Sequence, residues 1–156
     1  MKNARWTLEF TTHVLANSVN PTGYNDSFQR DSDNHLIWQS SWWYSAFMKA
    51  IDIAHIRGIK PGDINMDLVV DTPTAVYKRR YGEGKFRTHE AIMPGTQVTF
   101  EAVVADHVTE SNLKTILEKM GKFVGLSPYG YRLGFGKFRV INCTVTSSSD
   151  MEILPV

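Results

Sequence analysis

Cysteine is almost absent from this chain. Cys143 is the one cysteine in 156 residues, so the sequence offers neither a disulfide framework nor a cluster of thiolates for a metal. Long apolar runs are missing too: no stretch reaches the roughly 18 residues that a membrane-spanning helix needs. Residues 1–5 lead into a strand-like pattern and not into the apolar core of a signal peptide. These absences predict a soluble, cytoplasmic protein without a membrane partner.

Motifs of the common catalytic and nucleotide-binding sites are also missing. The chain has no Walker loop, no Gly-x-Ser-x-Gly elbow and no carboxylate cluster suited to two metals. Its five histidines show no metal-binding spacing. We therefore expect no cofactor and no metal site. His35, in a polar segment, is the candidate general acid or base if the protein is a metal-independent ribonuclease, although an exposed histidine without a catalytic role is far more common.

Apolar and aromatic residues are plentiful. With 42% hydrophobic and 12% aromatic residues, residues 1–156 are expected to form a single domain with a well-packed core. The net charge is only +1, but five basic and two acidic side chains lie between Lys78 and Glu90, and six basic and one acidic between Ser111 and Asn142. Such basic segments suit a negatively charged partner, although chance clustering on a solvated surface produces the same pattern.

Apolar periodicity predicts four strands and two helices. The strands are expected at residues 5–16, 64–77, 98–104 and 136–145. One helix should run from a cap at Ser40 or Ser41 to Gly58, and the other should start near Thr109. Residues 17–37 are polar and contain Asn-Pro-Thr-Gly, so they are expected to form a loop.

The order strand, helix, strand, strand, helix, strand predicts an α+β fold of the ferredoxin-like split βαβ type. Such a chain forms a four-stranded antiparallel sheet with both helices on one face. Three connections then meet at one end of the sheet: residues 17–37, a hairpin at 77–90 and a glycine-rich segment at 121–136. The two basic segments are therefore expected to converge on one site.

Both converging segments combine basic and aromatic side chains, which bind phosphates and stack on bases. The candidate binding residues are Lys78, Arg79, Arg80, Tyr81, Lys85 and Arg87 in the hairpin, and Tyr129, Gly130, Tyr131, Arg132, Gly134, Phe135, Gly136, Lys137 and Arg139 in the glycine-rich segment and the strand after it. The glycines allow close approach of a ligand, or they are merely a helix stop, a turn and a bulge. Trp42 and Trp43 could also stack on bases, but on a helix we expect them in the core.

The final segment resembles two groups of known proteins. Residues 120–126 and 132–140, with looser matches at 15–21 and 87–100, are similar to a family of short phage and prophage proteins without an assigned biochemical role. In that family an Arg-x-x-Gly-x-Gly-x-Phe-x-Val strand follows the helix. The resemblance implies a phage or other mobile element, acting in the cytoplasm of a host cell.

The wider resemblance is to the RAMP superfamily, the ferredoxin-like RNA-binding proteins of CRISPR systems. Their mark is a glycine-rich loop after the last helix that contacts the RNA backbone, and Gly130, Gly134 and Gly136 stand at the matching place. Residues 134–138 also echo the aromatic strand motif of RRM domains. An RRM carries that motif on its third strand, whereas here it opens the fourth, so the chain is not assigned to the RRM domains.

Three functions stay open from the sequence. The leading one is recognition of RNA or single-stranded nucleic acid at the converging loops. The second is a counter-defence protein, for example an anti-CRISPR, that inhibits a host defence protein or sequesters a phosphorylated small ligand in a compact pocket. The third is the metal-independent ribonuclease that uses His35. Binding without catalysis is favoured, and assembly into a homo-oligomer is left open.

Overall fold

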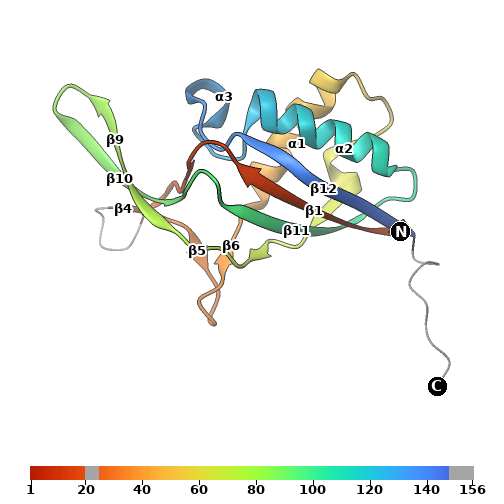
Figure 1. Cartoon of the computed structure of the whole chain (residues 1–156), viewed down its shortest axis with the longest axis horizontal. Coiled ribbons are helices and arrows are strands. Elements are labelled where there is room, and N and C mark those ends of the chain that lie inside the picture. Colours follow the sequence, from red (N-terminus) through yellow and green to blue (C-terminus); the bar gives the residue numbers. More distant parts are fainter. Residues whose placement is uncertain (20–24, 148–156) are drawn as a thin grey trace.

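The computed structural model describes residues 1–19 and 25–147, which form three sheets and three α-helices (Figure 1). The predicted α+β class is therefore confirmed. The strands are β1 (Lys2–Phe10), β2 (Val14–Leu15), β3 (Ser18–Val19), β4 (Asn25–Ser27), β5 (Gln29–Arg30), β6 (Leu36–Ile37), β7 (Ile64–Met66), β8 (Val69–Val70), β9 (Ala75–Gly82), β10 (Lys85–Ile92), β11 (Gln97–Val104) and β12 (Phe138–Ser147). The helices are α1 (Ser40–Ala54), α2 (Glu110–Lys119) and α3 (Gly130–Leu133), with a 3-10 turn at Pro61–Asp63 and a π-helical turn at Met120–Val124.

The four-stranded sheet has the order β12–β1–β11–β7, and each neighbouring pair is antiparallel. Side chains alternate between its two faces. Trp6, Leu8 and Phe100 are buried on one face, where α1 and α2 lie (Figure 1). The sheet has the predicted number of strands, but the chain as a whole has more, because other segments build two further sheets.

Aromatic rings fill the space between α1 and this sheet. The ring of Trp43 meets those of Trp6 and Phe100 edge to face, with centroids 5.8 Å and 4.9 Å away. Such pairs contribute about 0.5–1.5 kcal/mol beyond the burial of their area. Trp42 and Trp43 are 9% and 1% exposed, so both lie in the core as expected.

The ends of α1 differ from the prediction. Gln39 is the N-cap and makes no side-chain capping bond, so neither Ser40 nor Ser41 caps the helix. The C-cap is His55, which adopts the left-handed conformation with φ 55°, and Gly58 lies beyond it. Histidine adopts this conformation more often than most other non-glycine residues do. The helix therefore ends before the glycine that was expected to end it.

The second helix agrees with its prediction more closely. The Thr109 hydroxyl accepts a hydrogen bond from the Asn112 amide at 3.1 Å, which is a typical N-cap. Leu113, Ile116 and Leu117 are fully buried. None of the helices in the described residues is long and apolar enough to cross a bilayer.

Two segments pair differently from the prediction. Residues 17–37 were expected to be a loop, but within their described part β4 pairs with β3 and β10, and β5 forms a hairpin with β6. The predicted strand at 64–77 is divided among three partners: β7 joins β11, β8 joins β6, and β9 joins β10. Pro73, which cannot donate to a ladder, separates β8 from β9.

Glycines fix the connection between α2 and β12. A Cβ on Gly121 would lie 2.2 Å from the carbonyl oxygen of Phe138, and a Cβ on Gly136 would lie 2.7 Å from the carbonyl carbon of Leu126. Gly125 ends the π-helical turn with φ 86°. The backbones on either side of α3 are thus in direct contact, which places the segment between them.

We expect Gly121→Ala to destabilise the protein by about 3 kcal/mol, because the new methyl group overlaps both the backbone carbonyl and the buried ring of Phe138 in β12. Chemical denaturation measures this change. Gly62→Ala is the matched control, since nothing lies within 4 Å of a Cβ at that position, and it should change stability by less than about 0.5 kcal/mol. Equal effects of the two substitutions would contradict the close contact.

Candidate nucleic-acid interface

The strands β9 and β10 form a long antiparallel hairpin that extends away from the large sheet (Figure 1). The hairpin predicted at residues 77–90 is therefore confirmed with wider bounds. Lys78 and Lys85 are exposed on it, and Tyr81 and Phe86 are 57% and 50% exposed. The Lys78 ammonium lies 4.4 Å from the centroid of the Phe86 ring, a cation–π contact. Arg80 is also exposed, and its Nε donates to the Gly82 carbonyl.

The segment between α2 and β12 lies against this hairpin. The Arg79 guanidinium carbon is 4.5 Å from the centroid of the Tyr129 ring. The Phe135 ring meets Tyr77 edge to face at 5.6 Å, and Tyr77 also contacts the His13 ring at 4.6 Å. The two basic, aromatic segments therefore lie together in the structure, as the sequence analysis predicted.

Of the remaining candidate residues, Tyr131 and Arg132 lie on α3, which is close to α1. The Lys49 ammonium lies 4.4 Å from the centroid of the Tyr131 ring, which is 59% exposed. Gly130 is the first residue of α3, and Gly134, with φ 79°, has open space around it. A depression of about 520 Å³ lies here and is lined by Lys49, Pro128, Tyr129, Tyr131, Arg132 and Leu133.

Three of the predicted contact residues have other surroundings than expected. Gly136 is buried against Leu126, so the structure gives it a role in packing and not the expected place at the surface. The Arg139 guanidinium forms an ion pair with Glu9 on the face of the sheet opposite the helices. Lys137 is half-buried, and its burial lowers the pKa of its ammonium group.

Arg87 differs most from its prediction as a phosphate contact. Its Nε and Nη2 donate to the two carboxylate oxygens of Asp26 at 2.7 Å and 2.8 Å. Asp26 is 1% exposed, and a buried carboxylate is costly unless it is paired. The hydrogen bonds to Asp26, and then its charge, raise the pKa of Arg87. Arg87 therefore secures β4 to β10 and is already engaged.

His89 is a residue for which the sequence suggested no role. It is fully buried, and its Nδ1 lies 2.7 Å from the Ala16 carbonyl oxygen and 3.2 Å from Asp26 Oδ2. Arg79 Nε donates to His89 Nε2 at 3.1 Å. A guanidinium is only a donor, so Nε2 accepts and the ring proton is on Nδ1. Burial, more than any other cause, lowers the pKa of His89, which favours the neutral ring.

The sequence held one signal for His89. Residues of a strand alternate between faces, and His89 shares its face of β10 with the buried Ala91. An inward-facing histidine needs a partner, but its partners Asp26 and Ala16 lie 63 and 73 positions earlier in the chain. Spacing alone could not identify them.

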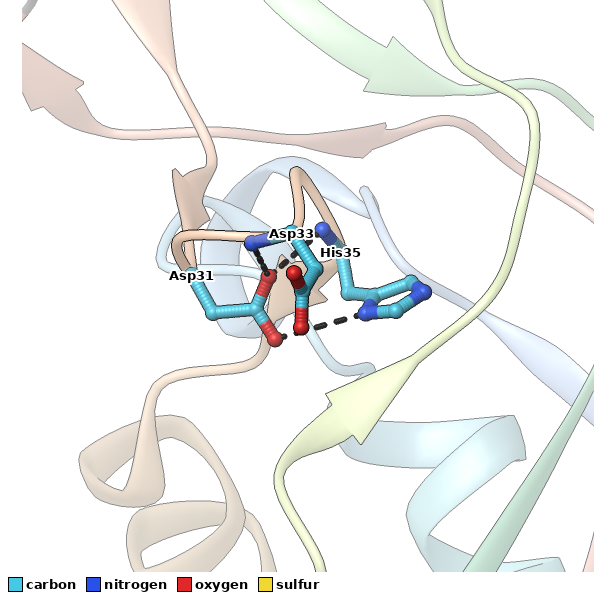
Figure 2. Close-up of side chains that lie close together, drawn as sticks. All are labelled: Asp31, Asp33 and His35. Atoms are coloured by element: carbon cyan, nitrogen blue, oxygen red, sulfur yellow. Dashed lines mark hydrogen bonds and ion pairs between the residues drawn. The ribbon is translucent and has the colours of Figure 1, made fainter.

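Figure 2 shows the turn that contains His35. Asp31 Oδ1 accepts from the amides of Asp33 and His35 at 3.0 Å and 2.8 Å, and Asp31 Oδ2 lies 3.4 Å from His35 Nδ1. The ligand atoms of these three residues lie within 4.8 Å of one another, but the Asp31 carboxylate already closes the β5–β6 turn. In Figure 1 this hairpin points away from α3. His35 thus contacts Asp31 in its own turn, and its use as a general acid or base stays a prediction.

Comparisons with known proteins agree with the fold. No protein-family model and no curated protein matches the chain, whereas 84 chains of solved structures do. One is a chain in the cryo-EM structure of the Type III-B Cmr-beta bound to cognate target RNA, with a TM-score of 0.56 and 17% sequence identity. The match covers 94% of this chain and 61% of that chain, so this protein spans less than two thirds of the other's length. At this identity the likeness shows the fold alone.

The pKa values of the buried His89 and the half-buried His13 predict that acid destabilises the fold. Burial lowers the pKa of both His89 and His13. An unfolded chain takes up protons on histidine near pH 6.5, whereas these folded histidines take them up only at lower pH. The unfolded state therefore binds more protons in this window, and stability falls as the pH falls. Urea titrations from about pH 7.5 down to about pH 5 should show this decline.

The matched variant for this prediction is His89→Asn, whose side chain does not titrate. Its stability should fall less steeply over the same pH range, and His13 should account for the slope that remains. A wild-type stability that is flat or increases on acidification would contradict the burial of a neutral His89.

Proposed function

We propose that this protein binds single-stranded RNA across the surface formed by the β9–β10 hairpin and residues 127–135. The observation that carries the proposal is the pair of contacts that joins the two segments: Arg79 with Tyr129, and Tyr77 with Phe135. They place cations and rings from distant parts of the chain on one surface. Rings that stack on bases beside cations that hold phosphates are the usual means of binding single strands.

Exposed rings favour an unpaired strand over a duplex. Tyr81, Phe86 and Tyr131 each expose half or more of their surface, and a ring can stack on a base only when the base is free of its own stack. Lys85 and Arg132 are exposed as well, and Lys78 lies over the Phe86 ring on the face of the hairpin opposite Arg79, so a bound strand would pass around the hairpin. The net charge of +1 argues against unselective coating of duplex DNA, which depends on many phosphate contacts.

The open face of the large sheet is less suited to this task. Thr7 and Thr99 bond to each other across it at 2.8 Å, and Glu9 pairs with Arg139. In the described part of β1, β11 and β12, the residues that alternate onto this face include no aromatic. Stacking of bases there, as in an RRM, has no ring to use.

We further propose that the large sheet with α1 and α2 is a ferredoxin-like core. If its four strands are numbered along the chain, their order across the sheet is fourth, first, third, second. The β9–β10 hairpin and the short strands would be additions to this core. The likeness to a chain of the RNA-bound Cmr-beta structure supports both this core and RNA as the partner. The single domain, the phage setting and the inhibition of a host defence protein stay predictions from the sequence.

The depression beside α3 favours a second candidate, a phosphorylated small ligand. Its volume of about 520 Å³ and its lining of two tyrosines with Lys49 and Arg132 suit one nucleotide. Competition separates the two candidates: a mononucleotide that displaces labelled RNA only at far higher concentration favours the strand.

We expect fluorescence anisotropy to show micromolar or tighter binding of a labelled RNA of about 20 nucleotides, which weakens as salt is raised. The triple variant Lys78→Ala, Lys85→Ala and Arg132→Ala should bind about tenfold or more weakly. Its salt dependence should also be shallower, by about 0.7 in the logarithmic slope for each phosphate that the variant no longer neutralises. None of the three residues belongs to the buried network around Asp26, so the fold should be retained.

The matched control removes the same charge elsewhere, through Arg57→Ala, Lys114→Ala and Lys119→Ala. These residues lie just after α1 and on α2, so affinity should change by less than about threefold if the surface and not the net charge binds RNA. Absence of RNA binding by the wild type at low salt would overturn the proposal. Equal losses in the two triple variants would remove the hairpin and α3 as the site.

A further inference from the structure

The buried pair of Asp26 and His89 lies directly behind the proposed RNA surface. The His89 ring meets the Tyr129 ring edge to face at 5.2 Å. Arg79 contacts both: its Nε donates to His89 Nε2 at 3.1 Å, and its guanidinium carbon lies 4.5 Å from the Tyr129 centroid. The three side chains are therefore in mutual contact.

The contacts of Arg79 leave most of its donors for a ligand. A guanidinium has five N–H groups. In the described part of the chain its Nε–H is the one that binds His89, so the four Nη protons are available for a phosphate. Tyr129 also lines the depression beside α3, where a base could stack. A phosphate group and a base of one nucleotide would thus meet neighbouring side chains.

We propose that His89 is the positioning residue of the RNA surface, whose neutral ring holds the Arg79 guanidinium across Tyr129. The imidazole is itself held at Nδ1, which donates to the Ala16 carbonyl and faces Asp26. Asp26 is in turn fixed by Arg87. This inference rests on the proposed function, and it assigns to buried residues the task of orienting the half-buried Arg79.

Protonation of His89 would break this arrangement. A proton on Nε2 would place one N–H donor against the N–H donor of Arg79. It would also add a positive charge next to Arg79 and Arg87. The carboxylate of Asp26, which faces the ring, is the group that favours the charged form. Burial lowers the pKa of His89, so RNA affinity should fall only at a pH below the usual histidine value of about 6.5. Arg79→Ala removes the group that His89 positions, so it should flatten this pH profile.

Two substitutions separate the two sides of the imidazole. His89→Asn keeps an amide N–H near the position of Nδ1 but removes the acceptor for Arg79. His89→Gln can place its amide oxygen near the position of Nε2, where it accepts from Arg79. If His89 acts by positioning Arg79, His89→Asn should weaken RNA binding about tenfold, and His89→Gln should stay within about threefold of the wild type. Circular dichroism at the assay temperature confirms that both variants are folded.

Two further measurements complete the test. The double variant His89→Asn with Arg79→Ala should bind RNA no more weakly than Arg79→Ala alone, because both remove one interaction. Nitrogen-15 NMR of the imidazole reads the tautomer in the protein without RNA. A neutral ring protonated on Nδ1 supports the inference, whereas a proton on Nε2 overturns it whatever the protein binds.

The outcomes distinguish this inference from the function on which it rests. If the wild type binds RNA and His89→Asn binds it equally well, the inference fails and the proposed function stands. Equal losses for the Asn and Gln variants that add to the loss from Arg79→Ala would show a general structural role and would also overturn the inference. A wild type that does not bind RNA overturns both.

Discussion

A carboxylate buried as deeply as that of Asp26 has to be paired, and the arrangement of the candidate surface depends on how this is done. An isolated buried charge would cost several kcal/mol. Arg87 and His89, two positions apart on β10, both face Asp26 and thereby tie β4 to β10. His89 extends the connection to Arg79 on β9 and to Tyr129 after α2. One buried charge thus joins four segments at the base of the hairpin.

The division of the large sheet into two unlike faces determines where a ligand can bind. The rings of Trp6 and Phe100 are buried in the core against α1, so they cannot contact a ligand. The opposite face carries threonines and ion pairs, such as Arg139 with Glu9, which are already satisfied. The hairpin and α3 instead carry exposed aromatic rings next to exposed basic residues. The candidate surface is therefore at the end of the sheet and not on it.

Basic residues that look alike in the sequence have different roles in the structure. Arg87 and Arg139 each hold a carboxylate, and Arg79 is shared between His89 and the Tyr129 ring. Lys85 and Arg132 are exposed, with side chains that can reach a phosphate. The first group shapes the surface, and the second supplies most of the charge that remains free for a ligand.

The sequence by itself determined the α+β class, both long helices, the hairpin and the meeting of the two basic segments, because these follow from local periodicity and from the order of the elements. The short strands of residues 17–37 and the division of 64–77 were decided by pairing between distant segments, which leaves little trace in a polar stretch. The same holds for the site. Its rings and charges were visible in the sequence, but Arg87 meets Asp26 across 61 positions and His89 meets Ala16 across 73. Which cations are consumed by buried partners, and which face solvent, was decided only by the tertiary structure, because desolvation and pairing depend on neighbours in space.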